Sequence, residues 1–82
     1  MARGRVNLPV ELQTLLAGDW ERVIGQAMLG REDRQIMRMY ILERMPQIDI
    51  AEELHMHRST VSRHMDKIMI EARRTAEKLD MV

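Results

Sequence analysis

The stretch "IAEELHMHRSTVSRHM", residues 50–65, decides the fold because it joins two short helical patterns through a tight break. The first pattern ends at the apolar Leu54, and the second begins near Arg58 with a run of hydroxyl and basic side chains. Two helices joined by a turn of about three or four residues form a helix-turn-helix unit. The stretch therefore predicts a helix-turn-helix.

Packing between the two predicted helices explains the small and apolar residues of this stretch. Ala51 is expected where the helices cross most closely, because a larger side chain would push them apart. The shared core is expected to contain Ile50, Leu54, Met56 and Val61. Alternate residues of the second helix are then left to face outward.

Hydroxyl and cationic side chains dominate the outward side of the second helix, and such side chains suit contact with DNA. The N-terminus of a helix favours phosphate, arginine bonds guanine in a bidentate manner, and serine or threonine bonds base edges. The candidate DNA-binding residues are His57, Arg58, Ser59, Thr60, Ser62, Arg63, Lys67 and Arg73. Within this set we expect Ser59, Ser62 and Arg63 at base edges and the remaining basic side chains at phosphates.

The distribution of charge supports this location, although the chain as a whole has a net charge of zero. Residues 55–74 carry five basic side chains against two acidic ones, whereas Asp49, Glu52 and Glu53 immediately before them are all acidic. The positive field is therefore local to the second helix of the motif. An ordinary helical hairpin with a solvated charged face is the alternative interpretation of the same pattern.

Glycine and proline residues divide the rest of the chain into helix-length segments, and none of these segments has the alternation of a strand. Helices are expected over residues 9–18, 19–30, 32–44, 48–54 and 58–79. Pro9 suits the first turn of a helix, Asp19 is expected as an N-cap, and Pro46 should end the third helix at the residue before it. The sequence predicts an all-α fold, a small bundle of four to five helices with a long C-terminal recognition helix.

Apolar residues recur at helical spacing in each segment and are expected to form the core. In the first two helices they are Leu12, Leu15, Leu16, Trp20, Val23, Ile24, Ala27 and Met28. In the third helix they are Ile36, Met37, Met39, Tyr40 and Ile41. The last helix has a continuous stripe of Val61, Met65, Ile68, Ala72, Ala76 and Leu79.

The 82 residues are expected to form a single domain, with residues 29–79 as the helix-turn-helix region and residues 1–28 as a packing or dimerisation region. A chain of this size buries only about 60% of its unfolded surface, and it has no cysteine to form a disulfide. The apolar surfaces of the N-terminal helices and of the C-terminal stripe could cover each other within one chain or pack across a two-fold axis. We expect a homodimer, because two motifs also bind DNA better than one.

The longer stretch "LGREDRQIMRMYILERMPQIDIAEELHMHRSTVSRHMDKIM", residues 29–69, resembles the region-4 helix-turn-helix of sigma-70-type factors and of small phage or mobile-element regulators. The resemblance rests on "MYILE", "IAEEL" and "STVSRHM" at the expected separations, and it extends to about residue 74. It implies a transcriptional regulator whose second motif helix binds promoter DNA, and it implies RNA polymerase as a further partner. The DNA-facing residues that it implies are Arg58, Ser59, Ser62, Arg63 and Lys67.

The turn of the motif departs from the pattern of this family. The family commonly has a glycine there because one residue adopts a positive φ, and His55 occupies this place in the present chain. Histidine enters the left-handed region more readily than most residues do. We therefore expect a left-handed histidine at the turn.

Other functional classes find little support in the sequence. It has no cysteine nucleophile and no glycine-rich phosphate loop, so we expect neither an enzyme nor a cofactor. The three histidines His55, His57 and His64 lack the spacing of a metal site. No apolar run approaches the length of a membrane span and no signal peptide is recognisable, so we expect a soluble, cytoplasmic protein. Arg3 and Arg5 form either a basic arm that reaches DNA or a frayed terminus.

Overall fold

The computed structural model describes residues 8–82, so Arg3 and Arg5 lie outside the described residues. The elements in chain order are a short 3-10 helix η1 (Val10–Leu12) and the α-helices α1 (Ala17–Gln26), α2 (Arg31–Ile41), α3 (Gln47–Leu54) and α4 (Arg58–Lys78). No strand occurs within residues 8–82, and the predicted all-α fold is confirmed. None of the helices in this part of the chain is long and apolar enough to cross a membrane.

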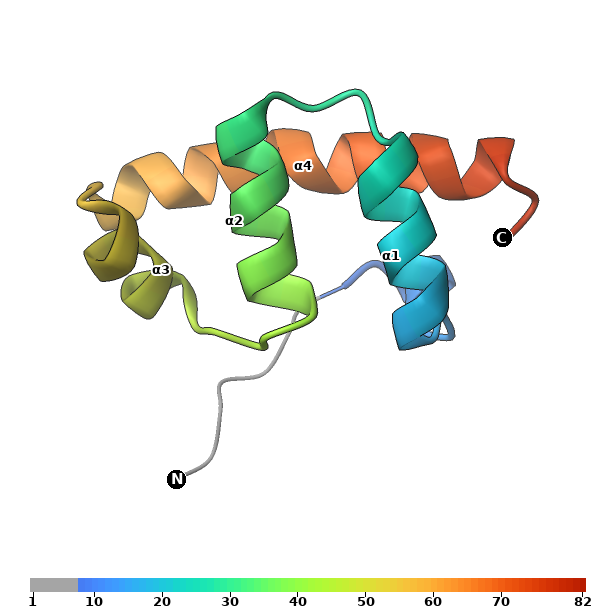
Figure 1. Cartoon of the computed structure of the whole chain (residues 1–82), viewed down its shortest axis with the longest axis horizontal. Helices are drawn as coiled ribbons and strands as arrows, with labels where there is room; N and C mark the ends of the chain where they lie inside the picture. The colour runs from blue at the N-terminus through green and yellow to red at the C-terminus, as the bar shows by residue number, and fades with distance from the viewer. Residues whose placement is uncertain (1–7) are drawn as a thin grey trace.

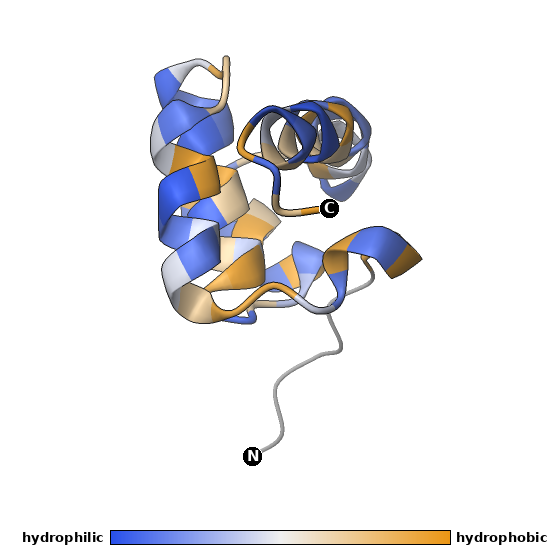
Figure 2. Cartoon of the chain, turned by 90° about the vertical axis from the view of Figure 1, so that its right-hand side faces the viewer, coloured by the Kyte–Doolittle hydropathy of each residue, from blue (hydrophilic) through white to orange (hydrophobic). Residues whose placement is uncertain are grey.

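Helix α4 is the element against which the other helices pack. Figure 1 shows α1 and α2 lying side by side across α4, and α3 lying beside its N-terminal end. In Figure 2 α4 is viewed nearly end-on, beside the other helices. The molecule is thus a small bundle in which one long helix contacts three shorter ones.

The apolar stripe of α4 is buried as the sequence predicts. Five of its six members are at most 5% exposed, namely Val61, Met65, Ile68, Ala72 and Ala76. The sixth, Leu79, lies just beyond the end of α4 and is half-buried. The predicted core residues of α2 are all buried as well. Residues of α1 complete the same cluster, in which Trp20 is 4% exposed and Val23 and Ile24 are fully buried.

The apolar surfaces of the N-terminal helices and of the C-terminal stripe of α4, which suggested a homodimer, are covered by this packing. The faces of α1 and of the C-terminal half of α4 cover each other within one chain. Of the two arrangements that the sequence allows, packing within one chain and packing across a two-fold axis, these two faces therefore adopt the first. The large apolar side chains that remain exposed in residues 8–82 are Val10, Leu16, Met28, Ile48, Ile70 and Val82.

The N-terminal segment differs most from the prediction. The helix expected over residues 9–18 is only the three-residue η1, in which Leu12 is buried, and Leu16 is 74% exposed instead of sharing its face. Asp19 is the third residue of α1 rather than its N-cap, and its carboxylate accepts the backbone N–H of Leu16 at 3.1 Å. A carboxylate at this position satisfies one free backbone donor and interacts favourably with the helix dipole.

The connections on either side of α2 also correct the prediction. Helix α1 ends at Gln26, so Met28 lies beyond it and is 78% exposed. Gly30 does not end that helix but is the N-cap of α2. Helix α2 ends at Ile41, earlier than expected, because the chain turns through Arg44 at a φ of 57° before Pro46 is reached.

The turn between α3 and α4 has the predicted left-handed histidine. His55 has φ 57° and ψ 44°, and the N–H of Met56 donates to the carbonyl of Ala51 at 2.8 Å. This is the hydrogen bond that a left-handed residue after a helix makes possible. The turn directs the chain from the end of α3 into the start of α4, so that the two helices pack together.

Replacing His55 by glycine is expected to stabilise the protein. Glycine adopts the left-handed conformation without the steric conflict of a Cβ, although it raises the entropy of the unfolded chain. We expect His55→Gly to raise the free energy of unfolding by about 0.5–1 kcal/mol in urea denaturation. His57→Gly is the matched control, since His57 has an ordinary φ of −73° and gains nothing. A less stable His55→Gly protein would show that the imidazole itself stabilises the turn.

Candidate nucleic-acid interface

The first two turns of α4 bring most of the predicted DNA-binding residues together. His57 is the N-cap of α4, with extended backbone angles, and the hydroxyl and basic side chains follow it directly. The exposed members of this group are His57, Arg58, Ser59, Ser62 and Arg63, and Thr60 is half-buried. The helix N-terminus therefore presents free N–H groups, hydroxyls and guanidinium groups on one end of the molecule.

The orientation of this group is fixed from the buried side of α4. Val61 is fully buried, and it packs in the same cluster as Ile50 and Ala51 of α3. Since successive residues of a helix are turned by about 100°, Arg63 lies about 200° away from Val61 and faces solvent. Ser59 lies one turn earlier on the same outward side. The core thus determines which side chains the motif presents.

Two arginines of this surface have no acidic partner. Arg58 and Arg63 have no carboxylate within 4.0 Å among residues 8–82. The guanidinium of Arg63 donates only a long hydrogen bond, to the Thr60 hydroxyl at 3.4 Å. Both cations are therefore available to an external acceptor.

Lys67 is not free in the same way, because it belongs to a cluster that crosses from α2 to α4. Asp33 lies in the first turn of α2, is only 6% exposed, and accepts Lys67 Nζ at 3.3 Å. Its other carboxylate oxygen lies 2.5 Å from Nδ1 of His64. The cluster holds one buried acid between two side chains that are a turn apart on α4. Lys67 is 63% exposed and still reaches the surface.

Arg73 does not join the group at the N-terminus of α4. Ten residues separate it from Arg63, which is about 15 Å along the helix axis. It pairs with Glu11 at 3.1 Å and with Glu77 at 3.7 Å. The structure therefore places Arg73 in a separate ion-pair network that connects α4 with η1.

The sequence analysis did not identify Asp33 as part of this surface. A carboxylate in the first turn of a helix is common because it complements the helix dipole, so Asp33 gave no distinctive signal. Its contacts with His64 and Lys67 depend on how α2 crosses α4. Spacing along the sequence does not reveal such a crossing.

The pKa of Asp33 follows from these contacts. Burial alone raises the pKa of this carboxyl, but the hydrogen bonds and charges of His64 and Lys67 outweigh burial and hold the pKa below the ordinary value of 3.8. A carboxyl with a lowered pKa in the folded state stabilises the protein above its unfolded pKa. This stabilisation is lost as the pH falls below 3.8 and through the lower pKa of the folded state.

Asp33→Asn is expected to abolish this part of the pH dependence. At pH 7 the variant should be less stable by about 1.5–3 kcal/mol, the range for hydrogen bonds that involve charged groups. The difference from the wild type should shrink as the pH falls below 3.8, because the unfolded wild type then takes up a proton at this carboxyl and the folded wild type follows as the pH passes its lower pKa. Urea denaturation at pH 7 and pH 3 measures it. The control is Asp66→Asn, at an exposed position with no ion pair among residues 8–82. An equal difference at both pH values would contradict this role of Asp33.

Helix α3 has the opposite charge on its exposed side. Asp49, Glu52 and Glu53 are all exposed, and with Met45 they line a shallow depression. In helix-turn-helix proteins the first helix of the motif crosses the phosphate backbone, where acidic side chains are repelled. The basic residues of α4 and the acidic residues of α3 therefore form two distinct faces.

Within residues 8–82 no group of three or more histidine, cysteine, aspartate or glutamate side chains is arranged to hold a metal ion. Comparison of the chain with protein-family models, with curated proteins and with solved structures finds no match.

Proposed function

We propose that this protein is a sequence-specific DNA-binding transcriptional regulator, which inserts the first turns of α4 into the major groove. One observation carries the proposal. The packing of α3 against α4 leaves hydroxyls and two arginines on the outward side of the helix that such motifs use to read bases. These arginines, Arg58 and Arg63, have no acidic partner among residues 8–82.

The side chains divide into two roles by their place on α4. Ser59, Ser62 and Arg63 face outward in the first two turns, where base edges are reached. His57 and Arg58 stand at the helix N-terminus and suit phosphate, together with the free N–H groups. Lys67 reaches a phosphate on the side of α4 that faces α2, and it shares its charge with Asp33.

Selection of bound DNA from a random library tests the proposal. We expect enrichment of one sequence motif, and we expect the logarithm of the affinity to fall linearly with the logarithm of the salt concentration. A slope of about −0.9 per phosphate contact would give the number of contacts. Unenriched DNA together with undetectable binding at low salt would overturn the proposal.

The acidic surface of α3 favours a second candidate function, in which the chain binds RNA polymerase or another transcription factor. The variant with Asp49→Asn, Glu52→Gln and Glu53→Gln distinguishes the two functions. For a DNA-binding protein, removing these charges should leave the affinity for DNA equal or higher, because phosphate repulsion falls. For a protein-binding module, the same variant should lose the protein partner, and the wild type should not select a DNA motif.

A homodimer on two DNA half-sites stays part of the proposal on general grounds, since motifs of this kind commonly bind in pairs. The apolar faces of α1 and α4 are used within the chain, so pairing must involve individually exposed side chains such as Leu16 or occur only on DNA. Sedimentation equilibrium of the wild type and of Leu16→Glu, each with and without the selected DNA, measures it. A wild type that stays monomeric in both conditions would exclude the dimer.

A further inference from the structure

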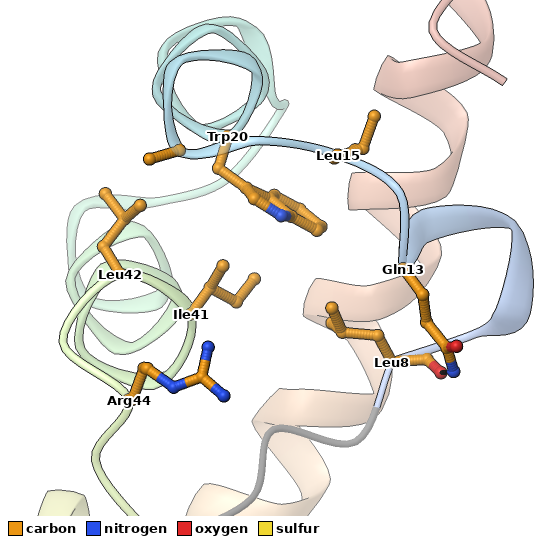
Figure 3. Close-up of a pocket in the computed structure, with 8 residues that line it drawn as sticks. Leu8, Gln13, Leu15, Trp20, Ile41, Leu42 and Arg44 are labelled. Atoms are coloured by element: carbon orange, nitrogen blue, oxygen red, sulfur yellow. Dashed lines mark hydrogen bonds between the residues drawn. The ribbon is translucent and has the colours of Figure 1, made fainter. Parts of the chain in front are cut away.

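A cleft on the side of the molecule away from α3 has no place in the proposed function. It lies between the segment before α1, the first turn of α1 and the end of α2, and its volume is about 240 Å³ (Figure 3). Its lining residues are Leu8, Gln13, Leu15, Ala17, Trp20, Ile41, Leu42 and Arg44. Sites for drug-sized ligands run from roughly 300 to 1,000 Å³, so this cleft suits a smaller molecule.

The indole of Trp20 supplies a hydrogen-bond donor that no residue of the described part of the chain accepts. The residue is only 4% exposed, and its indole N–H has no acceptor among residues 8–82. In this part of the chain no fully buried side-chain nitrogen or oxygen lacks a partner, so the indole nitrogen must open onto the cleft. Figure 3 shows this nitrogen on the ring edge that faces Ile41 and Arg44. A nearly buried donor is thus directed at the space inside the cleft.

Arg44 supplies a second donor and a positive charge at the rim of the same cleft. Its guanidinium points toward the cleft in Figure 3 and has no carboxylate within 4.0 Å among the described residues. Its backbone is left-handed, with a φ of 57°. The adjoining wall is held by Gln13, whose side-chain amide donates to the carbonyl of Leu8 at 3.0 Å.

These features together specify one chemical class of ligand. The leucine and isoleucine side chains of the cleft offer an apolar wall, whereas the indole N–H and the guanidinium both require an acceptor. A carboxylate accepts from a guanidinium through two parallel hydrogen bonds and carries the complementary charge. An ammonium group would be repelled by Arg44, and an alcohol would gain no charge interaction.

We propose that this cleft binds a small apolar carboxylate, with its carboxylate at Trp20 Nε1 and Arg44 and its short hydrocarbon chain against Leu8, Leu15 and Leu42. The site is separate from the DNA-binding surface, and it does not depend on the proposed function. It is built from side chains of two stretches that are far apart in the sequence, residues 8–20 and residues 41–44.

Trp20 is the only tryptophan of the chain, so its fluorescence reports on this site alone. Hexanoate, hexan-1-ol and hexylamine are matched probes that differ only in the polar group. We expect a saturable fluorescence change with hexanoate and a dissociation constant on the order of millimolar, because few atoms make contact. Hexan-1-ol should bind at least about tenfold more weakly, since it lacks the charge-assisted hydrogen bonds. Hexylamine should give no saturable change. In NMR the single indole N–H resonance should move downfield with hexanoate, as a new hydrogen bond requires.

Arg44→Gly is the decisive variant, because glycine adopts the left-handed backbone readily while the guanidinium is lost with the rest of the side chain. The affinity for hexanoate should fall at least about tenfold, since the charge-assisted hydrogen bonds are lost. The affinity for hexan-1-ol should not change, because the apolar wall of Leu8, Leu15 and Leu42 remains. Arg22→Gln removes an equal charge from the exposed side of α1 and should bind hexanoate as the wild type does. A linear, unsaturable response to hexanoate, or equal hexanoate affinity in Arg44→Gly and the wild type, would overturn the proposal.

Discussion

Arg63→Ala is expected to weaken sequence-specific DNA binding strongly while leaving the helical fold intact. The side chain lies on the outward side of α4 beyond its first turn, and it makes no contact with a carboxylate in the described part of the chain. A bidentate contact of arginine with guanine contributes about 1–3 kcal/mol of discrimination between bases. The affinity for the selected sequence should therefore fall by roughly five- to 150-fold. The affinity for unrelated DNA should change much less.

The control for this variant is Lys78→Ala, which removes a positive charge from the last turn of the same helix. Lys78 is exposed and has no ion pair within residues 8–82. Comparison of the two variants separates a contact in the groove from a general effect of charge. Circular dichroism of both should match the wild type. If Arg63→Ala retains wild-type affinity for the selected sequence, Arg63 does not read bases.

The helix-turn-helix region could be predicted from the sequence because its signals are local and agree with one another. The stripe of α4 keeps a helical spacing from Val61 to Ala76, and the structure buries all of it. The end of α3 follows from a turn that only a left-handed residue can make, and His55 adopts that conformation. Periodicity and turn geometry are properties of neighbouring residues. Predictions that depend on them therefore do not require knowledge of how distant helices pack.

The N-terminal segment could not be predicted in the same way because its signals conflict. Leu12 and Leu16 are four residues apart, as on one helix face, but Leu12 is fully buried and Leu16 is 74% exposed. The structure instead ends η1 at Leu12 and begins α1 at Ala17, with Leu16 exposed between them. An isolated short helix is marginal in water, so tertiary packing decided where the helix begins.

The candidate sites also differ in how far the sequence alone could predict them. The exposed residues of α4 follow from the position of its buried stripe, so they could be inferred from spacing alone. The cluster around Asp33 and the cleft beside Trp20 depend on contacts between helices that are distant in the sequence. Their members are individually ordinary: an acid in the first turn of a helix and an aromatic residue on an apolar face. Only the crossing of the helices brings them together with their partners.

The crossing of α3 and α4 gives the second large expected effect. Ala51 is 5% exposed and lies in the core cluster with Ile50 and Val61, both of which are fully buried. The sequence predicts a small residue at this crossing, and the structure buries it. Its carbonyl also accepts the N–H of Met56 in the turn, so the backbone at this point is fixed. A larger side chain therefore cannot be accommodated by a local shift of the backbone.

Ala51→Leu is expected to destabilise the protein by about 1–3 kcal/mol, the usual effect of adding carbon atoms to a packed core. The loss should appear as a lower urea midpoint with an unchanged dependence on urea concentration. Glu52→Leu introduces the same side chain at the next position of α3, where it is exposed, and should change the free energy of unfolding by no more than about 0.5 kcal/mol. DNA affinity should fall for Ala51→Leu even under conditions where the protein is fully folded, because the added side chain changes the angle at which α3 supports α4. A variant that matches the wild type in both stability and DNA binding would mean that the two helices do not meet at Ala51.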